Sequence, residues 1–197
     1  SEGFVVAQPA ANGSIPRWNI STGSGSQRDV AFLRAVVEDI ARELPIDRQA
    51  VFAAGFSNGG GMVHRLACEA SDLVAAIGVV AGQQVVVDAC TPADPVAVAA
   101  LHGTSDDIVP FTGDGLLFPP ITLWIQGWAE RNSCSEPPQS SQPVPDVDRT
   151  VWEGCTDGAT VELHTIDGGE HRWPTMPSDP ISATDTLWDF FSTHARD

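Results

Sequence analysis

The chain has no lysine and no tyrosine. The absence of lysine leaves the chain with few positive charges, which bears on the partners that it can bind. All ten basic residues among the 197 are arginine, against 26 acidic residues, which gives a formal net charge of −16. Such an acidic surface repels phosphate backbones and anionic lipid headgroups. We therefore expect neither nucleic acid nor a membrane surface as a partner.

Long apolar runs and metal-binding spacings are missing as well. No apolar segment approaches the roughly 20 residues that a membrane-spanning helix needs, and no signal peptide precedes the apolar residues 3–7. Neither H-E-x-x-H nor C-x-x-C occurs, so a metal site has no support and no cofactor is expected. The length suits one domain with a real core, and we expect residues 1–197 to form that domain.

The most informative segment that is present spans residues 50–61. It reads A-V-F-A-A, then G-F-S-N-G, then G-G, which is a short apolar strand followed by G-x-S-x-G and a helix-compatible sequence. A serine that attacks an ester must stand on a tight strand-to-helix turn, and glycines two residues before and after it leave room for that turn. Ser57 is thus the candidate nucleophile, and an ordinary Gly/Ser turn is the alternative interpretation.

Two later loops supply candidates for the acid and the base that a serine nucleophile needs. An apolar strand at 96–101 continues into H-G-T-S-D-D-I-V-P, and an alternating strand at 159–166 continues into D-G-G-E-H-R-W-P. The chain order Ser, Asp, His is that of α/β-hydrolases. Both loops leave strands at the sheet edge where ligands bind in open α/β folds. His171 is the candidate base, and the residues alone leave Asp106 and Asp107 both open as the acid.

The other histidines are interpreted as structural. His102 is expected to be a turn residue that hydrogen-bonds to backbone, and His64 is expected to be solvated or to line a groove. His164 lies on the polar face of its strand and His194 at a helix end, where a cation is favourable. Neither of these two is a good candidate for the base.

Strands and helices alternate along the chain. Apolar strands indicate a mostly parallel sheet with helices on both faces, so the predicted fold class is α/β. Trp124 and Trp128, at i and i+4 on one helix, are predicted to lie in the core. The expected strands are 3–8, 50–54, 73–80, a short piece at 85–87, 96–101 and 159–166; the expected helices are 27–44, the segment after Ser57, 121–132 and a last helix from 182; residues 136–149 are expected to be a proline-rich loop.

The motifs G-F-S-N-G-G, H-G-T-S-D-D-I-V-P and G-G-E-H-R-W-P together resemble the secreted polyhydroxybutyrate depolymerase and feruloyl esterase group of α/β-hydrolases. The resemblance extends from about residue 3 to residue 193, and the pair Trp18-Asn19 fits the same pattern. It implies that Ser57 is the nucleophile, that His171 is the general base, and that Asp106 rather than Asp107 is its partner.

The resemblance also implies an activity and further site residues. We expect a secreted serine esterase, extracellular or periplasmic, whose oxyanion donor includes the backbone N–H of Asn58. Its substrates would be feruloyl or acetyl esters of plant polysaccharide, or polyhydroxyalkanoates. Trp18 and Trp173 either line the substrate groove or simply pack under the loops. A hydrolase-fold chain that binds without catalysing a reaction is the alternative from another class.

Four cysteines without metal-binding spacing suit two disulfides in an exported protein. Four buried thiols in a cytosolic protein are the alternative. Three pairings are possible for four cysteines, and the resemblance implies Cys68 with Cys90 and Cys134 with Cys155.

In the group that the chain resembles, the segment before Gly3 supplies a central strand that ends in His-Gly. That strand lies between the strand expected at 3–8 and the strand before Ser57, and its loop gives a second oxyanion N–H. The His-Gly pair of this chain, His102-Gly103, belongs to the acid loop. We therefore expect the fold to lack its N-terminal strands. Either an upstream segment of the same protein fills the gap, or the sheet joins the two strands directly.

Overall fold

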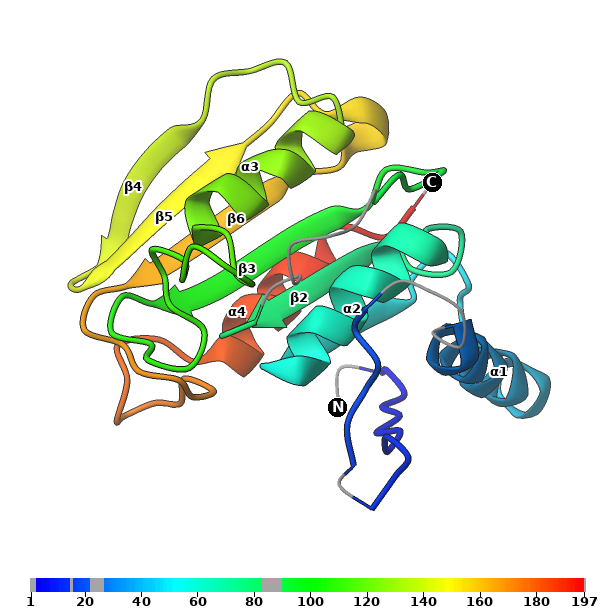
Figure 1. Ribbon diagram of the computed structural model, residues 1–197. Helices are drawn as coiled ribbons and strands as arrows, with labels where there is room; N and C mark the ends of the chain where they lie inside the picture. The colour runs from blue at the N-terminus through cyan, green and yellow to red at the C-terminus, as the bar shows by residue number, and fades with distance from the viewer. Residues whose placement is uncertain (1–2, 15, 22–26, 83–89, 197) are drawn as a thin grey trace.

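The computed structural model describes residues 3–14, 16–21, 27–82 and 90–196, so the short strand expected at 85–87 lies outside the described residues. Figure 1 shows the described chain as a twisted sheet with helices against it. Its elements are α1 (Gln27–Glu43), β1 (Phe52–Phe56), α2 (Asn58–Glu69), β2 (Ala76–Val80), β3 (Ala97–Gly103), α3 (Ile121–Arg131), β4 (Gln139–Val144), β5 (Val147–Trp152), the 3-10 turn η1 (Thr156–Gly158), β6 (Val161–Ile166) and α4 (Ala183–Ser192).

The sheet has the strand order β1-β2-β3-β6-β5-β4. The first four of these strands run parallel, and β5 and β4 continue the sheet antiparallel. Both β2 and β3 are buried along their whole length, as expected for strands that are covered on both faces. Because β1, β3 and β6 are parallel, the segments that follow them emerge at the same edge of the sheet.

Helices cover both faces, so the predicted α/β class is confirmed. One apolar cluster joins α2 and α3 to the sheet, and α1 packs against α2 and adds Val30 to the same cluster. A second cluster lies on the opposite face under α4, which Figure 1 draws behind the strands. Trp124 and Trp128 are 6% and 0% exposed in the first cluster, which confirms that they are core residues.

The loop predicted over 136–149 is wrong, because most of it forms the hairpin of β4 and β5. Its prolines suggested a loop, but Pro143 lies in β4, the outermost and exposed strand, where a missing backbone donor is tolerated. Val144 pairs with Val147 across the turn. In that turn Asp146 has φ 64°, and proline followed by a residue with positive φ is typical of a type II turn.

The strand predicted at 3–8 is also wrong, because the structure has no strand there. An apolar, β-branched sequence forms a strand only where a neighbouring edge supplies ladder partners. These residues make no ladder with β1, the outer described strand on that side, and Phe4 instead packs its ring on Trp188 of α4 with centroids 4.5 Å apart. Of the two alternatives given above, the direct joining of this segment to the strand before Ser57 is therefore not observed.

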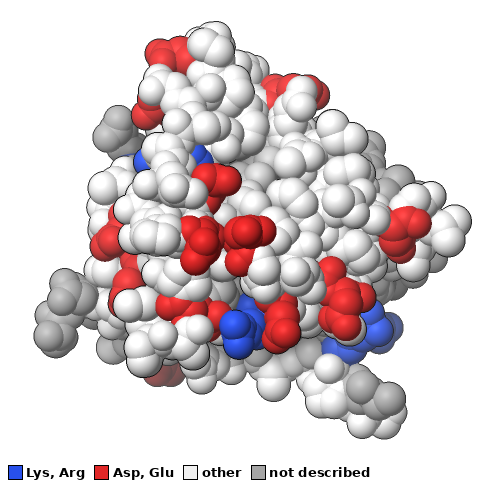
Figure 2. Space-filling model, turned by 90° about the vertical axis from the view of Figure 1, so that its left-hand side faces the viewer, with Lys and Arg blue, Asp and Glu red and all other residues white. Residues whose placement is uncertain are grey.

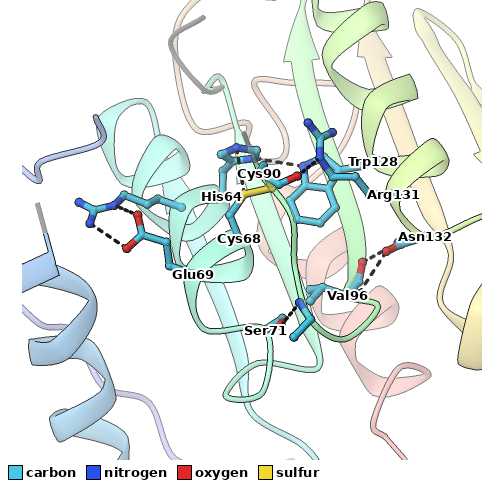
Figure 3. Close-up of a disulfide and its surroundings, with 11 residues drawn as sticks. His64, Cys68, Glu69, Ser71, Cys90, Val96, Trp128, Arg131 and Asn132 are labelled. Atoms are coloured by element: carbon cyan, nitrogen blue, oxygen red, sulfur yellow. Dashed lines mark hydrogen bonds and ion pairs between the residues drawn. A yellow bond between two sulfur atoms is a disulfide. The ribbon is translucent and has the colours of Figure 1, made fainter. Parts of the chain in front are cut away.

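The structure forms two disulfides, Cys68–Cys90 and Cys134–Cys155, which is the pairing that the resemblance implies. The first ties the end of α2 to the chain that leads into β3 (Figure 3). His64 lies beside it with an exposed fraction of 1%, so the prediction of a solvated or groove histidine is wrong. The reason is the packing of α3 on α2, which places the rings of Trp124 and Trp128 against His64.

His64, Cys68 and Cys90 form a group with metal-ligand atoms within 4.8 Å of one another, but its chemistry does not suit a metal. Both sulfurs are consumed by the disulfide. Trp128 Nε1 donates to His64 Nδ1 at 3.1 Å (Figure 3), and an indole nitrogen can only donate. A neutral His64 therefore carries its hydrogen on Nε2, the atom that faces the Cys68 sulfur at 3.4 Å, and offers no lone pair there.

Candidate active site

Ser57 stands on a strained turn between β1 and α2. Its backbone angles are φ 52° and ψ −116°, a region that non-glycine residues rarely adopt and that often marks functional positions. The Ser57 amide donates to Val80 O at 2.9 Å, which anchors the turn to the end of β2. Gly55 makes the turn possible, because a Cβ there would lie only 2.1 Å from Gly59 O.

The structure brings Ser57, His171 and Asp106 together in one hydrogen-bonded chain. His171 Nε2 is 2.9 Å from Ser57 Oγ, and His171 Nδ1 is 2.8 Å from Asp106 Oδ2. The Asp106 side chain is fully buried and that of His171 is 14% exposed. Asp107, the other candidate left open by the residues, is exposed to solvent. Ser57 follows β1, Asp106 follows β3 and His171 follows β6. All three residues therefore lie at the same edge of the parallel part of the sheet.

The Asp106 carboxylate is held in its ionised form. Burial alone would raise its pKa, but hydrogen bonds from His102, the Val109 amide, His171 and the Ile108 amide outweigh burial and hold the pKa well below its ordinary value. An ionised carboxylate only accepts, so His171 Nδ1 carries the hydrogen of their bond. The lone pair of neutral His171 is then on Nε2, facing the Ser57 hydroxyl, as a general base requires.

The acid loop and the histidine loop are joined backbone to backbone. Gly103, the last residue of β3, lies so close to Gly169 that a Cβ at position 103 would be 2.0 Å from Gly169 O. The Ser105 amide donates to the same oxygen at 2.9 Å. Thr104 Oγ1 accepts from the Gly168 amide at 2.8 Å and donates to the Asp167 carboxylate at 3.1 Å. These contacts fix the separation of Asp106 and His171.

Trp18 is bound through its backbone to the residue that follows the nucleophile. The Trp18 amide donates to Asn58 Oδ1 at 2.8 Å, and Asn58 Nδ2 donates to Trp18 O at 3.1 Å. The buried Arg65 donates to Asn19 O at 2.5 Å. The half-buried indole of Trp18 stacks on Phe32 of α1 with centroids 6.3 Å apart. The Trp18 backbone therefore lies beside the start of α2, while its side chain packs against the apolar cluster of that layer.

Trp173 lies just after His171 in sequence and packs against the apolar cluster under α4. Its Nε1 donates to Thr184 Oγ1 at 3.1 Å, which ties the loop after β6 to the start of α4. Phe56, which precedes the nucleophile, brings its ring to 4.9 Å from the His171 ring and is 37% exposed. Phe56 was not among the predicted site residues, although its place inside G-x-S-x-G indicates that it borders the site.

The face that carries the loops after β3 and β6 is turned to the viewer in Figure 2, and acidic side chains cover more of it than basic ones. The loop residues Asp107, Asp167 and Glu170 are exposed. Arg172 is the one arginine in the described stretches 104–120 and 167–180, and it pairs with Asp179 at 2.7 Å. The field at this face therefore repels anions.

A cavity of about 500 Å³ lies at the other end of the sheet, where β2, β3 and β6 begin. None of the three hydrogen-bonded residues lines this cavity. Its lining includes charged and titratable side chains, among them Asp72, Asp94, Asp157, His194 and Arg196. The three hydrogen-bonded residues therefore identify the candidate active site, and the cavity lies elsewhere.

In the part of the chain that the structure describes, none of the helices combines the length and the apolar character that a membrane-spanning helix needs.

Comparisons with known proteins found relatives both by sequence and by fold. Feruloyl esterase B of Piromyces equi is 31% identical over an alignment of 185 residues, which covers 87% of this chain and 34% of that enzyme. A probable feruloyl esterase C of Aspergillus clavatus is 32% identical over an alignment of 188 residues, which covers 92% of this chain and 62% of that protein. An acetyl xylan esterase from Aspergillus awamori has a TM-score of 0.62 at 18% identity over 89% of this chain and 73% of that one. No family model matches the chain.

The fold is that of an α/β-hydrolase. The curated relatives of this chain are feruloyl esterases, which are about 32% identical to it over most of its residues. The chain spans about a third of the length of the Piromyces equi relative and somewhat under two thirds of the Aspergillus clavatus one. The resemblance seen in the motifs is thus matched by sequence similarity over nearly the whole chain.

Proposed function

We propose that this α/β-hydrolase chain is a serine esterase that hydrolyses carboxylic esters through an acyl-enzyme. The observation that carries the proposal is the hydrogen-bonded chain from Asp106 through His171 to Ser57, with Ser57 on a strained strand-to-helix turn. A nucleophile, a base and an orienting acid in this geometry suit acyl transfer. A structural role alone gives no reason for a serine with φ 52° to face a histidine.

In this proposal His171 takes the Ser57 proton as Oγ attacks the ester carbonyl. Asp106 keeps the imidazole in the productive tautomer and stabilises the imidazolium that forms. The oxyanion is held by the backbone N–H of Asn58, the first residue of α2, where the helix N-terminus favours negative charge. His171 then returns the proton to the leaving alcohol, and water hydrolyses the acyl-enzyme by the same path.

The proposed substrates are feruloyl or acetyl esters of plant polysaccharide. The names of the sequence relatives and of the acetyl xylan esterase that shares the fold support this class. The acidic face disfavours anionic substrates and agrees with a neutral ester. Trp18, whose backbone bonds to Asn58, and Trp173, two residues after His171, are proposed to contact the aryl or sugar group, since aromatic faces suit both. The two disulfides agree with a protein that works outside the cytosol.

A polyhydroxyalkanoate depolymerase is the second candidate, because apolar side chains project from the same loops. Ile108 and Leu116 in the loop after β3 and Met176 in the loop after β6 are 60%, 84% and 61% exposed. Exposed apolar groups near a catalytic centre suit adsorption to an aliphatic polyester.

Hydrolysis of p-nitrophenyl acetate, with and without a serine-directed organophosphonate, tests the esterase proposal. We expect turnover that the phosphonate abolishes. A folded chain without turnover would instead support a binding chain that is not an enzyme. A parallel assay on methyl ferulate, acetylated xylan and polyhydroxybutyrate then chooses the substrate class. Preference for the polyester would favour the second candidate.

A further inference from the structure

A second histidine contacts the acid of the proposed triad. His102 lies on β3, one residue before its end, and is 2% exposed. Its Nε2 is 2.8 Å from Val109 O and 3.3 Å from Asp106 Oδ2. The expected backbone bond of His102 is therefore present, but the same nitrogen also faces the carboxylate that His171 uses.

The acceptors around His102 fix its hydrogen. Val109 O can only accept, so His102 Nε2 must carry a hydrogen, and the Asp106 oxygen at 3.3 Å shares it. The other carboxylate oxygen, Oδ1, accepts from the amides of Ile108 and Val109 at 3.0 and 2.8 Å. Four donors thus surround the Asp106 carboxylate, two on each oxygen.

Those four donors leave the carboxylate with one productive orientation. A rotation that moved Oδ2 away from His171 would also break the bond with His102, and it would pull Oδ1 from two backbone amides. Among the described residues, the titratable side chains that contact Asp106 are His102 from β3 and His171 from the loop after β6. Phe111, whose ring centroid is 6.2 Å from that of His102, carries no charge.

We propose that His102 is a positioning residue for the reaction: its Nε2–H holds Asp106 in the orientation that presents Oδ2 to His171, and it takes up part of the carboxylate's negative charge. The inference rests on the proposed esterase function. His102 touches neither the substrate nor the reacting atoms. It acts through Asp106, and its effect should appear in the chemical step and in the pH dependence of that step.

Loss of the His102 donor changes two measurable quantities. Without it Asp106 can rotate, so kcat falls while KM, which reflects substrate contacts made elsewhere, stays nearly constant. In the molecules that keep the productive orientation, the carboxylate has more of its charge left for the imidazolium, which favours the protonated form in the population that reacts. The acid limb of the kcat/KM profile then moves to higher pH.

The experiment compares His102→Leu, His102→Gln and wild type on p-nitrophenyl acetate across pH. We expect His102→Leu to lower kcat by about 10- to 100-fold, with KM within about twofold and the acid limb moved up by about half a pH unit or more. His102→Gln keeps an N–H donor at the same reach and should recover most of kcat. The matched control is His164→Gln, a buried histidine on β6 that contacts Glu162 at 3.1 Å and lies outside the triad.

An unchanged pH profile and unchanged kcat in folded His102→Leu would overturn the proposal, as would equal effects in the His164 control. If His102→Leu does not fold, the ¹⁵N shifts of wild-type imidazoles decide. They must place the His102 hydrogen on Nε2, and a hydrogen on Nδ1 would contradict the inference. Wild type without esterase activity would instead refute the proposed function, while the tautomer measurement still tests the geometry.

Discussion

Replacing Gly103 by alanine should separate the two loops that carry Asp106 and His171. The new Cβ would lie 2.0 Å from Gly169 O and 2.3 Å from its carbonyl carbon, and both are backbone atoms. Real Cβ atoms stay at least 3.0 Å away, so the loops must move apart by at least about 1 Å. Such a shift would take the His171–Asp106 contact from 2.8 Å to about 3.8 Å, beyond a hydrogen bond.

A misplacement of about 1 Å can cost about 100-fold in rate, and we expect that loss in kcat on p-nitrophenyl acetate, with little change in KM. Strain from the extra methyl group should also lower the free energy of unfolding by about 1–3 kcal/mol, measured by urea denaturation. The matched control is Gly127→Ala inside α3, where the new Cβ meets the end of the Arg131 side chain and no backbone atom.

The control should keep full activity and gain up to about 1 kcal/mol from the better helix propensity of alanine. Full activity in Gly103→Ala would refute the reasoning, because it would mean that the contact with Gly169 does not set the distance between Asp106 and His171. A loss of activity in both variants would be equally damaging.

Asp106→Asn should lower kcat by about 10⁴-fold, since the amide removes the charge behind His171 and permits the wrong tautomer; steady-state kinetics on the folded variant measures this. Burial disfavours the charged form of Glu162, but hydrogen bonds from His164 and Arg149 outweigh it and lower the pKa of Glu162 to about 2. Its stabilisation is therefore present above pH 4.5 and is lost as pH falls toward 2. It is worth at most about 3 kcal/mol, and urea titrations of Glu162→Gln should show a weaker loss of stability over that window. Replacing Cys68 and Cys90 by serine should cost about 3 kcal/mol for a loop of 22 residues, whereas an unchanged urea midpoint would show that the bridge does not stabilise the fold.

Local patterns predicted the parallel part of the sheet and the order of the catalytic segments. Burial on both faces requires the apolar runs of β2 and β3, and the tight turn requires the glycines around Ser57. Both signals are local, so they can be read directly from the sequence. The hairpin of β4 and β5 was missed because proline suppresses a strand prediction, although an exposed edge tolerates it. The apolar residues 3–8 were overinterpreted, since a strand also needs a partner edge that no local pattern reveals.

Most of the site was predictable as residue types and little of it as contacts. Ser57, His171 and Asp106 follow from motifs and chain order. The contact of Gly103 with Gly169 and that of His102 with Asp106 depend on how two loops meet across parallel strands, which no spacing in the chain encodes. The burial of His64 depends in the same way on the packing of α3 against α2.

The central claim is that Ser57 is a nucleophile activated by His171, and labelling with a fluorophosphonate tests it most directly. Intact mass and peptide mapping should show one adduct per chain, located on Ser57. Labelling should be strongly reduced in His171→Ala and absent after denaturation, because the hydroxyl is reactive only beside its base. An adduct on another residue, or a folded chain that the reagent leaves unlabelled, would contradict the account.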